Sequence, residues 1–383
     1  MRKVCVVITA RATYGRAKTL LSAIQQHPDL KLQLVAAGSA LLERYGHVVT
    51  QIENDGFFID ARISNSSIMD EATSAAVTTG SGISELACIF ERIRPDVVVT
   101  VADRFETMST AVAAAYMNIP LAHVQGGEVT GNIDEKVRHA ISKLADVHFV
   151  ATSEARKRLI RMGEVPETVF YTGCPSLDIV MEVLKNPELD FDPYKLYGGI
   201  GSQPNLTDPF LTVLQHPVTT EPDLSEEQLN STLSAIISLQ LPVLWFLPNA
   251  DRGTAGTFSR ISTFYAQNTL LPFHFFNNMR PEHFLKILKN CVCFIGNSSC
   301  GIREGATLGV PAVNIGTRQK GRERGQNVLD AEHRSDSIFE AAQRQIARAH
   351  FPPDFIYGKG NAGQQIADLL AIIPLSIEKK ITY

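Results

Sequence analysis

Runs of continuously apolar residues alternate with segments of helical periodicity along the first half of the chain. Continuous Val- and Ile-rich runs are typical of strands buried on both faces, and an apolar residue every three to four positions is typical of helices. The apolar runs are 3–9, 32–37, 96–102, 119–124, 146–152 and 168–173, and the helical segments are 14–26, 69–93, 104–117, 134–145 and 153–162. This alternation predicts repeated β–α–β units around a parallel sheet, which is a Rossmann-like domain.

A second alternation follows a stretch rich in Pro, Gly and Asp at 186–209, which we interpret as an interdomain linker with surface loops. Its predicted strands are 210–215, 242–249, 271–276, 292–296 and 311–316, and its predicted helices are 225–238, 281–290, 299–308 and 335–349. A chain of 383 residues fits two such α/β domains. Open α/β sheets bind ligands at the carboxyl ends of their strands, so we expect the site in the interdomain cleft.

Charge and composition narrow the class of protein. The chain has 36 Lys and Arg against 40 Asp and Glu, a net charge of -4, without the basic excess that nucleic-acid binding requires. The N-terminal apolar run from Val4 to Ala10 meets Arg11 at once, which is too short for a signal peptide or a membrane span. We therefore expect a folded cytoplasmic protein that binds neither nucleic acid nor membranes.

Residues 295–322 contain a strand end, a polar turn and a predicted helix. The free N–H groups and dipole of a helix N-terminus favour an anion such as phosphate, and the hydroxyls of Ser298 and Ser299 add donors. The alternative is that Asn297 or Ser298 only caps a structural helix.

Two further side chains favour a ligand at this turn. Glu304 can accept two hydrogen bonds from a diol such as a ribose, and Arg318 can bind a phosphate through two N–H groups. Together they suggest a nucleoside diphosphate, although a solvated basic loop is the alternative for residues 318–324.

Residues 122–143 form the densest polar group in the first domain. His123 ends a predicted strand, a glycine pair at 126–127 allows close backbone approach, and Glu128 follows in the loop. Asp134 begins a predicted helix, and Arg138 lies one turn later on the same face. A helix cap and an i,i+4 pair are the alternative for these last two residues.

Other polar residues also follow predicted strands. Arg11 comes after the first strand, Asp103 and Arg104 after the strand at 96–102, His216 after the strand at 210–215, and Asn249 at the end of the strand at 242–249. His216 could donate to a leaving diphosphate or act as an acid or base. A surface ion pair is the alternative for Asp103 and Arg104, and a structural role is the alternative for His216.

Several common motifs are missing. The chain has no G-x-G-x-x-G turn, G-x-x-x-x-G-K-[ST] loop or G-x-S-x-G elbow. Cys291 and Cys293 would point to opposite faces of a strand and have no second cysteine pair beside them. No metal or nicotinamide cofactor is therefore expected, and nucleoside diphosphate chemistry with acid and base carboxylates is favoured.

The motifs GGEVTGNIDEKVRHAISKLA, GCPSLD, LQHPVTT, IGNSSCGIRE and NIGTRQKGRE resemble those of the hydrolysing UDP-N-acetylglucosamine 2-epimerases of sialic- and legionaminic-acid synthesis. The resemblance covers about residues 3–365 and includes no kinase half. It implies a GT-B fold, with domains at 1–185 and 186–360 and a C-terminal helix at about 361–383 packing back on the first. It also implies the conversion of UDP-GlcNAc and water to UDP and N-acetylmannosamine, by C2 deprotonation, loss of UDP to give a glycal, and addition of water, without NAD or metal.

The resemblance also implies roles for individual residues. The implied catalytic residues are Asp103, Glu128, Asp134, His123 and His216, with Asp103 and Asp134 as the essential pair. The implied contacts to UDP and substrate are Arg11, Arg104, Gln125, Arg138, Asn249, Ser298, Ser299, Glu304 and Arg318. Since family members commonly self-associate, a homo-dimer or homo-tetramer is expected.

The chain departs from the family pattern at four positions. Related enzymes often carry an acidic residue, two histidines and a Glu where this chain has Thr13, Ala40, Val101 and Gln125. A carboxamide cannot act as a general base near neutral pH. Three alternatives therefore stay open: the same reaction on UDP-2,4-diacetamido-2,4,6-trideoxyhexose, a GT-B glycosyltransferase, and a non-catalytic UDP-sugar sensor.

Overall fold

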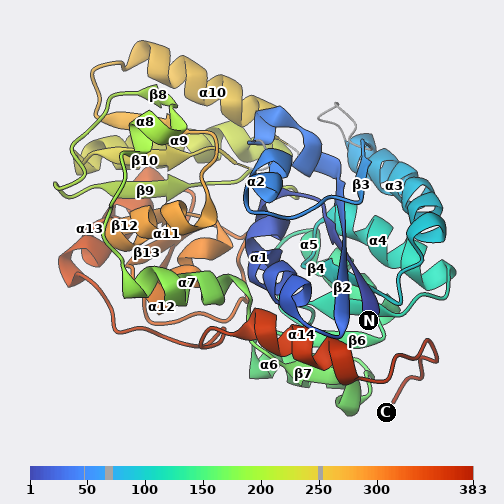
Figure 1. The fold of residues 1–383 in the computed structure, drawn as a ribbon. Helices are drawn as coiled ribbons and strands as arrows, with labels where there is room; N and C mark the ends of the chain where they lie inside the picture. Colours follow the sequence, from blue (N-terminus) through green and yellow to red (C-terminus); the bar gives the residue numbers. More distant parts are fainter. Residues whose placement is uncertain (47, 65–71, 249–252, 383) are drawn as a thin grey trace. The chain divides into compact units, whose positions relative to one another are not determined.

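The chain forms two compact units (Figure 1). The computed structural model describes residues 1–46, 48–64, 72–248 and 253–382. Unit 1 comprises Met1–Glu128, Ile133–Ile179 and Tyr357–Tyr383, and unit 2 comprises Val129–Asn132 and Val180–Ile356. Within the described residues, no helix is both long and apolar enough to cross a bilayer.

Unit 1 is built on a seven-stranded sheet of order β3-β2-β1-β4-β5-β6-β7, in which every pair is parallel. Its strands are β1 (Arg2–Ile8), β2 (Leu30–Ala37), β3 (Ala61–Ile63), β4 (Val97–Val101), β5 (Leu121–Val124), β6 (Val147–Val150) and β7 (Val169–Tyr171). The helices around it are α1 (Arg11–Gln26), α2 (Val48–Asn54), α3 (Ala72–Ile93), α4 (Phe105–Tyr116), α5 (Asp134–Leu144), α6 (Ser153–Arg161) and α14 (Ala362–Ile372), and α7 (Ser176–Lys185) begins in this unit. The predicted parallel sheet is confirmed.

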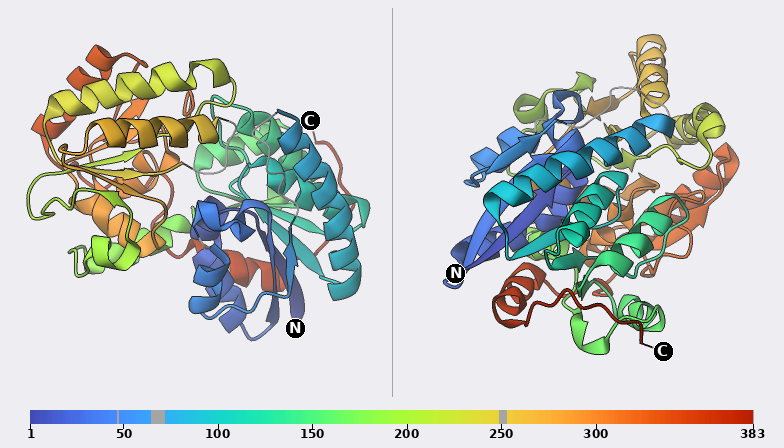
Figure 2. Two further views of the ribbon diagram at one scale, coloured as in Figure 1. Left: turned by 90° about the horizontal axis from the view of Figure 1, so that it is seen from above. Right: turned by 90° about the vertical axis from the view of Figure 1, so that its right-hand side faces the viewer.

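Both faces of this sheet are covered, as β1 illustrates. Val4, Val6 and Ile8 pack with residues of α1 and α14, whereas Cys5 and Val7 pack with residues of α3, α4 and α5 (Figure 2). Successive side chains of a strand point to opposite faces, so a strand with helices on both sides must be apolar throughout. Each fully buried Val or Ile contributes about 1.5–3 kcal/mol relative to an exposed position.

Unit 2 repeats this architecture with one antiparallel edge. Its sheet order is β14-β13-β12-β9-β10-β11-β8, and only β8 pairs antiparallel among the described strands. The strands are β8 (Ile200–Gly201), β9 (Leu211–Leu214), β10 (Val243–Phe246), β11 (Phe273–Phe276), β12 (Cys293–Gly296), β13 (Ala312–Ile315) and β14 (Val328–Ala331). The helices are α8 (Pro193–Tyr197), α9 (Ser225–Leu239), α10 (Thr254–Gln267), α11 (Pro281–Asn290), α12 (Glu304–Leu308) and α13 (Ser335–Arg348).

Two predictions from sequence need correction. The helix expected at 299–308 is not continuous: a 3-10 turn at Ser299–Gly301 precedes α12, which has five residues. The Gly301 carbonyl accepts a hydrogen bond from Asn327 Nδ2 at 3.1 Å, which takes it out of an intrahelical ladder. The segment 186–209, expected to be a linker, contains α8 and the edge strand β8.

The C-terminal segment belongs to unit 1, and Asp178 of the GCPSLD motif holds it there. The Asp178 carboxylate accepts the backbone N–H groups of Asn361, Ala362 and Gly363 at 2.7, 2.8 and 2.8 Å, at the start of α14. Thr19 of α1 donates its hydroxyl to the same carboxylate at 2.9 Å. One side chain therefore caps α14 and ties it to α1.

Candidate active site

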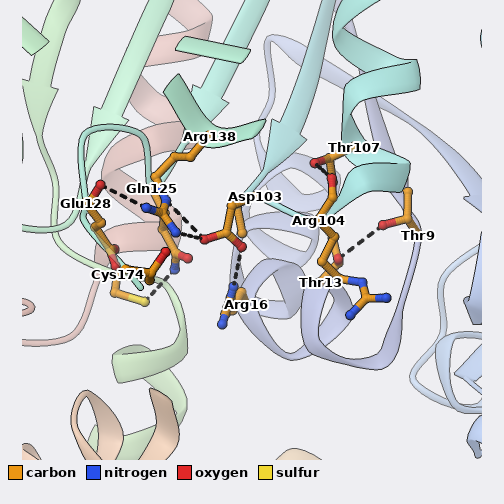
Figure 3. A network of polar contacts seen from close by, with 12 residues as sticks. Thr9, Thr13, Arg16, Asp103, Arg104, Thr107, Gln125, Glu128, Arg138 and Cys174 are labelled. Atoms are coloured by element: carbon orange, nitrogen blue, oxygen red, sulfur yellow. Dashed lines mark hydrogen bonds and ion pairs between the residues drawn. The ribbon is translucent and has the colours of Figure 1, made fainter. Parts of the chain in front are cut away.

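Asp103 follows β4 and is held by arginines from two helices (Figure 3). Ala102, the residue before it, has a left-handed φ of 68°, an uncommon conformation for a residue with a Cβ atom that turns the chain sharply at the strand end. Arg138 of α5 donates from Nε to Asp103 Oδ2 at 3.0 Å and also from Nη2 to the same oxygen. Arg16 Nη1 of α1 lies 4.0 Å from Asp103 Oδ1.

Arg138 is fully buried and acts on other protein groups. Besides Asp103, it donates from Nη1 to the Glu128 carbonyl at 2.9 Å and to Glu135 Oε2 at 3.0 Å. Burial alone would lower the pKa of its guanidinium, but the charges of Asp103, Glu128 and Glu135 raise that pKa, so the group is a cation. The resemblance implies a substrate contact for Arg138, which stays a prediction. The bonds on the page are to protein groups, and they hold the Asp103 carboxylate in place.

His123 is buried at the end of β5, with both ring nitrogens engaged. Nε2 lies 2.8 Å from the Ala102 carbonyl and Nδ1 lies 3.1 Å from Ser142 Oγ. Burial lowers the pKa of this imidazole to about 3, so it is neutral: Nε2–H donates to Ala102, and Nδ1 accepts from Ser142. A neutral ring bonded in this way holds the backbone before Asp103. The proton-transfer role that the resemblance implies for His123 stays a prediction.

The glycine pair after β5 packs tightly against this group. A Cβ atom at Gly126 would lie 2.8 Å from Ser142 Oγ and 2.9 Å from His123 Nδ1. Gly127 has a φ of +76°, and a Cβ atom there would lie 2.4 Å from the Ala155 carbonyl. The two glycines therefore let the loop that carries Glu128 lie directly on the helices behind it.

Gln125 contacts a residue that sequence reasoning missed. Its φ is 68°, and its Nε2 donates to Cys174 Sγ at 2.7 Å, while Ser176 Oγ lies 3.0 Å from the same sulfur. Gln125 Oε1 is buried, and no group of the described residues forms a hydrogen bond with it. Cys174 lies in the GCPSLD motif quoted above, so the motif marked this place, but no local pattern connected it to Gln125.

Three further unit 1 candidates lie at helix starts. Asp134 is the half-buried first residue of α5, and Arg11 is the half-buried first residue of α1. Arg104, which precedes α4, donates from Nε and Nη2 to the two carboxylate oxygens of Glu106 at 3.0 and 3.1 Å. Glu106 was also missed from the sequence, because acidic residues in the first turn of a helix are common for purely structural reasons.

The positions that depart from the family pattern are packed inside unit 1. Thr13 is buried, with its hydroxyl 3.3 Å from Thr9 Oγ1. Ala40 is buried and donates its N–H to the Thr9 carbonyl at 3.1 Å, and Val101 is a core residue at the end of β4. None of these side chains can exchange a proton near neutral pH.

In unit 2, Asn297 connects the ends of two strands. Gly296 ends β12 with a φ of 149°, and a Cβ atom there would lie 2.1 Å from the Leu214 carbonyl of β9. The Asn297 side chain accepts from the His216 N–H at 2.7 Å and donates to the His216 carbonyl at 2.8 Å. His216, which is buried, is thereby fixed at the carboxyl end of β9.

The loop after β13 contacts Asn297. Arg318 Nη1 and Gln319 Nε2 donate to the Asn297 carbonyl at 3.1 and 2.9 Å. Ser298 Oγ accepts from the Cys300 N–H at 3.4 Å, so Ser298 is the N-cap of the 3-10 turn, as the structural alternative expected. The structure therefore brings Ser298, Arg318 and His216 together around Asn297.

Glu304 and Asn249 complete the unit 2 candidates. Glu304 begins α12 and is buried, and within the part of the chain that the structure describes its Oε2 has no hydrogen-bond partner. Burial and then the charge of Glu304 raise the pKa of the Cys300 thiol to about 12, so Glu304 and Cys300 are near neighbours. Ser299, the first residue of the 3-10 turn, is half-buried. Asn249 lies outside the described residues.

Known proteins resemble this chain along most of its length. Residues 22–371 match the UDP-N-acetylglucosamine 2-epimerase family. The chain is 34% identical to the UDP-N,N'-diacetylbacillosamine 2-epimerase (hydrolyzing) of Legionella pneumophila, over 98% of this chain and 97% of that protein. It is 31% identical to the UDP-N-acetylglucosamine 2-epimerase of Neisseria meningitidis, over 94% and 92%.

A solved structure has the same fold at lower identity. The UDP-GlcNAc 2-epimerase of Methanocaldococcus jannaschii, solved with UDP-GlcNAc and UDP, superposes with a TM-score of 0.80 at 17% identity, over 96% of this chain and 99% of that chain. The fold is thus the GT-B type, with two Rossmann-like domains. Since the family match spans most of the chain and relatives above 30% identity align along nearly all of it, this chain is an enzyme of the UDP-N-acetylglucosamine 2-epimerase family.

Proposed function

We propose that this enzyme converts UDP-GlcNAc and water to UDP and N-acetylmannosamine. The observation that carries the proposal is the Asp103 carboxylate, which Arg138 holds at the carboxyl end of β4. Epimerisation at C2 needs a group that exchanges a proton at a carbon atom, and an oriented carboxylate is suited to that task. A glycosyltransferase needs no such group, so this alternative is weaker.

The reaction proceeds in two stages in this proposal. A carboxylate of the group Asp103, Glu128 and Asp134 takes the C2 proton, and the C1–O bond breaks with its electron pair leaving on UDP, which gives a glycal. His216 assists the departure of the diphosphate. Water then adds its oxygen to C1, and a proton returns to C2 on the opposite face, which gives N-acetylmannosamine.

Unit 2 supplies the main nucleotide contacts in this proposal. Arg318 binds the diphosphate, the hydroxyls of Ser298 and Ser299 donate to it, and Glu304 accepts from the ribose hydroxyls. The buried Glu304 Oε2, which has no partner among the described residues, supports the last assignment, because an unpaired carboxylate oxygen in the interior is unfavourable until a donor reaches it. Arg11, Arg104 and Asn249 are proposed as further UDP contacts.

A second substrate is supported by the relatives. The Legionella pneumophila protein, named for UDP-N,N'-diacetylbacillosamine, aligns over 98% of this chain. We therefore keep the UDP-2,4-diacetamido-2,4,6-trideoxyhexose as the alternative substrate of the same chemistry. In either case we propose a cytoplasmic homo-dimer or homo-tetramer that supplies sialic-acid or legionaminic-acid synthesis.

A proton NMR time course in D2O tests the reaction and the substrate together. The purified enzyme is mixed with each UDP-sugar in turn, and free UDP and the C2 proton of the released sugar are followed. We expect UDP release from UDP-GlcNAc and N-acetylmannosamine carrying deuterium at C2. UDP release from the diacetamido UDP-sugar but not from UDP-GlcNAc would make the diacetamido compound the substrate. Binding of both UDP-sugars without UDP release would favour a sensor.

A further inference from the structure

Helix α5 holds the residue Asp103 at two points. Arg138 and Ser142 are four residues apart, so they lie on the same face of the helix, and both are fully buried. Arg138 bonds the Asp103 carboxylate, and Ser142 bonds His123, which in turn bonds the Ala102 carbonyl. A shift of α5 would therefore move both the side chain of Asp103 and the peptide that precedes it.

The C-terminal end of α5 is fixed by a residue far away in sequence. Lys379 Nζ donates to the Ser142 carbonyl at 3.2 Å, to the Ala145 carbonyl, and to Glu164 Oε2 at 2.6 Å. The last carbonyls of a helix have no intrahelical partner, and the negative end of the helix dipole favours a cation. An ammonium has three N–H donors, so each donor of Lys379 has an acceptor.

Glu164 makes this cap rigid. Its carboxylate is buried and also accepts from Lys143 Nζ at 2.6 Å and from His148 Nε2 at 3.0 Å. Burial alone would raise the pKa of Glu164, but hydrogen bonds from His148, Lys143 and Lys379 lower that pKa to about 2, so the group is an anion at neutral pH. Because Lys143 belongs to α5, the helix is bound to Glu164 directly as well as through Lys379.

The chain around Lys379 is docked on unit 1. Thr382 donates its N–H to the Gly163 carbonyl at 3.1 Å and its hydroxyl to the Glu164 carbonyl at 3.3 Å. Figure 1 shows this red segment leaving α14 beside β6 and β7. Lys379 thus reaches α5 from a segment that the preceding contacts hold in place.

We propose that Lys379 is a positioning residue for proton transfer at C2, acting through Ser142 and His123 on Asp103. The inference rests on the proposed function, because it assigns Asp103 to that step. Lys379 touches no substrate: it sets the place of α5, and α5 sets the place of the Asp103 carboxylate. A displacement of about 1 Å at a reacting group can reduce turnover by about 100-fold.

Steady-state kinetics of Lys379→Met test this role, with Lys380→Met as the matched control, since Lys380 is exposed on the same segment. Loss of the cap should lower kcat by about 10- to 100-fold while KM and the Kd for UDP change less than about twofold. Lys379→Arg, which keeps the charge and the donors, should restore part of kcat. Lys380→Met should match the unaltered enzyme.

A double-mutant cycle separates positioning from general stability. If Lys379 acts through Ser142, then Lys379→Met combined with Ser142→Ala should lose little more kcat than the worse single variant. The proposal would be overturned if the kcat losses of the two single variants multiplied in the double variant. It would also be overturned if the kcat of Lys379→Met stayed within about twofold of the unaltered enzyme. If Lys379→Met does not fold, Lys379→Gln, which keeps N–H donors without the charge, takes its place in the cycle. An unaltered enzyme that releases no UDP would overturn the proposed function instead.

Discussion

Arg138 and Asp103 form a buried ion pair whose partners are separated by 35 residues. Two charges in the interior are costly to desolvate, so such a pair adds little net stability, but removing one partner leaves an uncompensated charge. The pair therefore serves orientation: it fixes where the Asp103 oxygen atoms point. The nearby Arg16 acts on the other oxygen of the same carboxylate.

Changing Arg138→Met should separate orientation from substrate binding. Without the guanidinium, Asp103 loses two donors, so kcat should fall by about 100-fold or more, whereas the Kd for UDP should hardly change. The free energy of unfolding should fall by about 3–5 kcal/mol because one buried charge is left unpaired. Kinetics, UDP titration and urea unfolding measure the three effects.

Arg161→Met is the control for this change, because Arg161 is an exposed residue of α6. It should alter none of the three quantities. A weaker affinity for UDP in Arg138→Met, at unchanged kcat, would support the substrate contact that the resemblance implies for Arg138.

Sequence reasoning identified Asp103, His123 and Arg138 because each stands at a strand end or one turn into a helix. It missed the pairing of Asp103 with Arg138, because a contact between residues 35 positions apart leaves no local pattern. It also could not show that Ser142 and the Ala102 carbonyl occupy both ring nitrogens of His123. Residue types could be predicted, and directions of side chains could not.

At the level of elements, the turn after β5 and helix α5 are fitted to each other. Gly126 leaves no room for a Cβ atom between Ser142 Oγ and His123 Nδ1, which are the two atoms that join α5 to β5. The backbone of Gly126 therefore packs directly against the hydrogen bond between Ser142 and His123. A methyl group at Gly126 must displace one of these two side chains.

Changing Gly126→Ala should lower kcat by about tenfold or more without loss of UDP affinity, because the added methyl group pushes α5 away from His123. Gly80→Ala is the matched control: Gly80 lies within α3, and a Cβ atom there would meet no atom of the described residues within 4 Å. That substitution should raise the unfolding free energy by about 0.5–1 kcal/mol. Equal kinetics for the two variants would show that the fit at Gly126 is irrelevant to turnover.

The elements themselves differ in how far the sequence predicts them. Val- and Ile-rich runs gave the central strands of both sheets, whereas the three-residue β3, with Arg62 at its centre, has no such run. Helix α10 (Thr254–Gln267) was missed because its Thr and Ser residues have low helix propensity. The helix expected at 299–308 is interrupted, because Asn327, which is distant in sequence, donates a hydrogen bond to the Gly301 carbonyl.

On the scale of the whole molecule, buried histidines make stability depend on pH. His123 and His148 are fully buried and lie side by side as register partners of β5 and β6. Burial lowers the pKa of both imidazoles, in His123 to about 3. Below pH 6.5 these two imidazoles bind protons in the unfolded chain but stay neutral in the folded chain. Their contribution to the free energy of unfolding therefore falls as the pH falls.

Urea unfolding at pH 7.5 and 5.5, followed by far-UV circular dichroism, should show this loss. His123 alone should lower the free energy of unfolding by about 1.4 kcal/mol between pH 7.5 and pH 5.5. The unfolded imidazole takes up its proton within this range, whereas the folded imidazole, with a pKa of about 3, does not. His123→Gln, which cannot titrate, should lose that share of the pH dependence. The single tryptophan, Trp245, lies in β10 of unit 2, so its fluorescence separates the transition of that unit from that of unit 1. An equal pH dependence in His123→Gln would mean that other groups govern acid unfolding, and that the ring of His123 is accessible to protons in the folded enzyme.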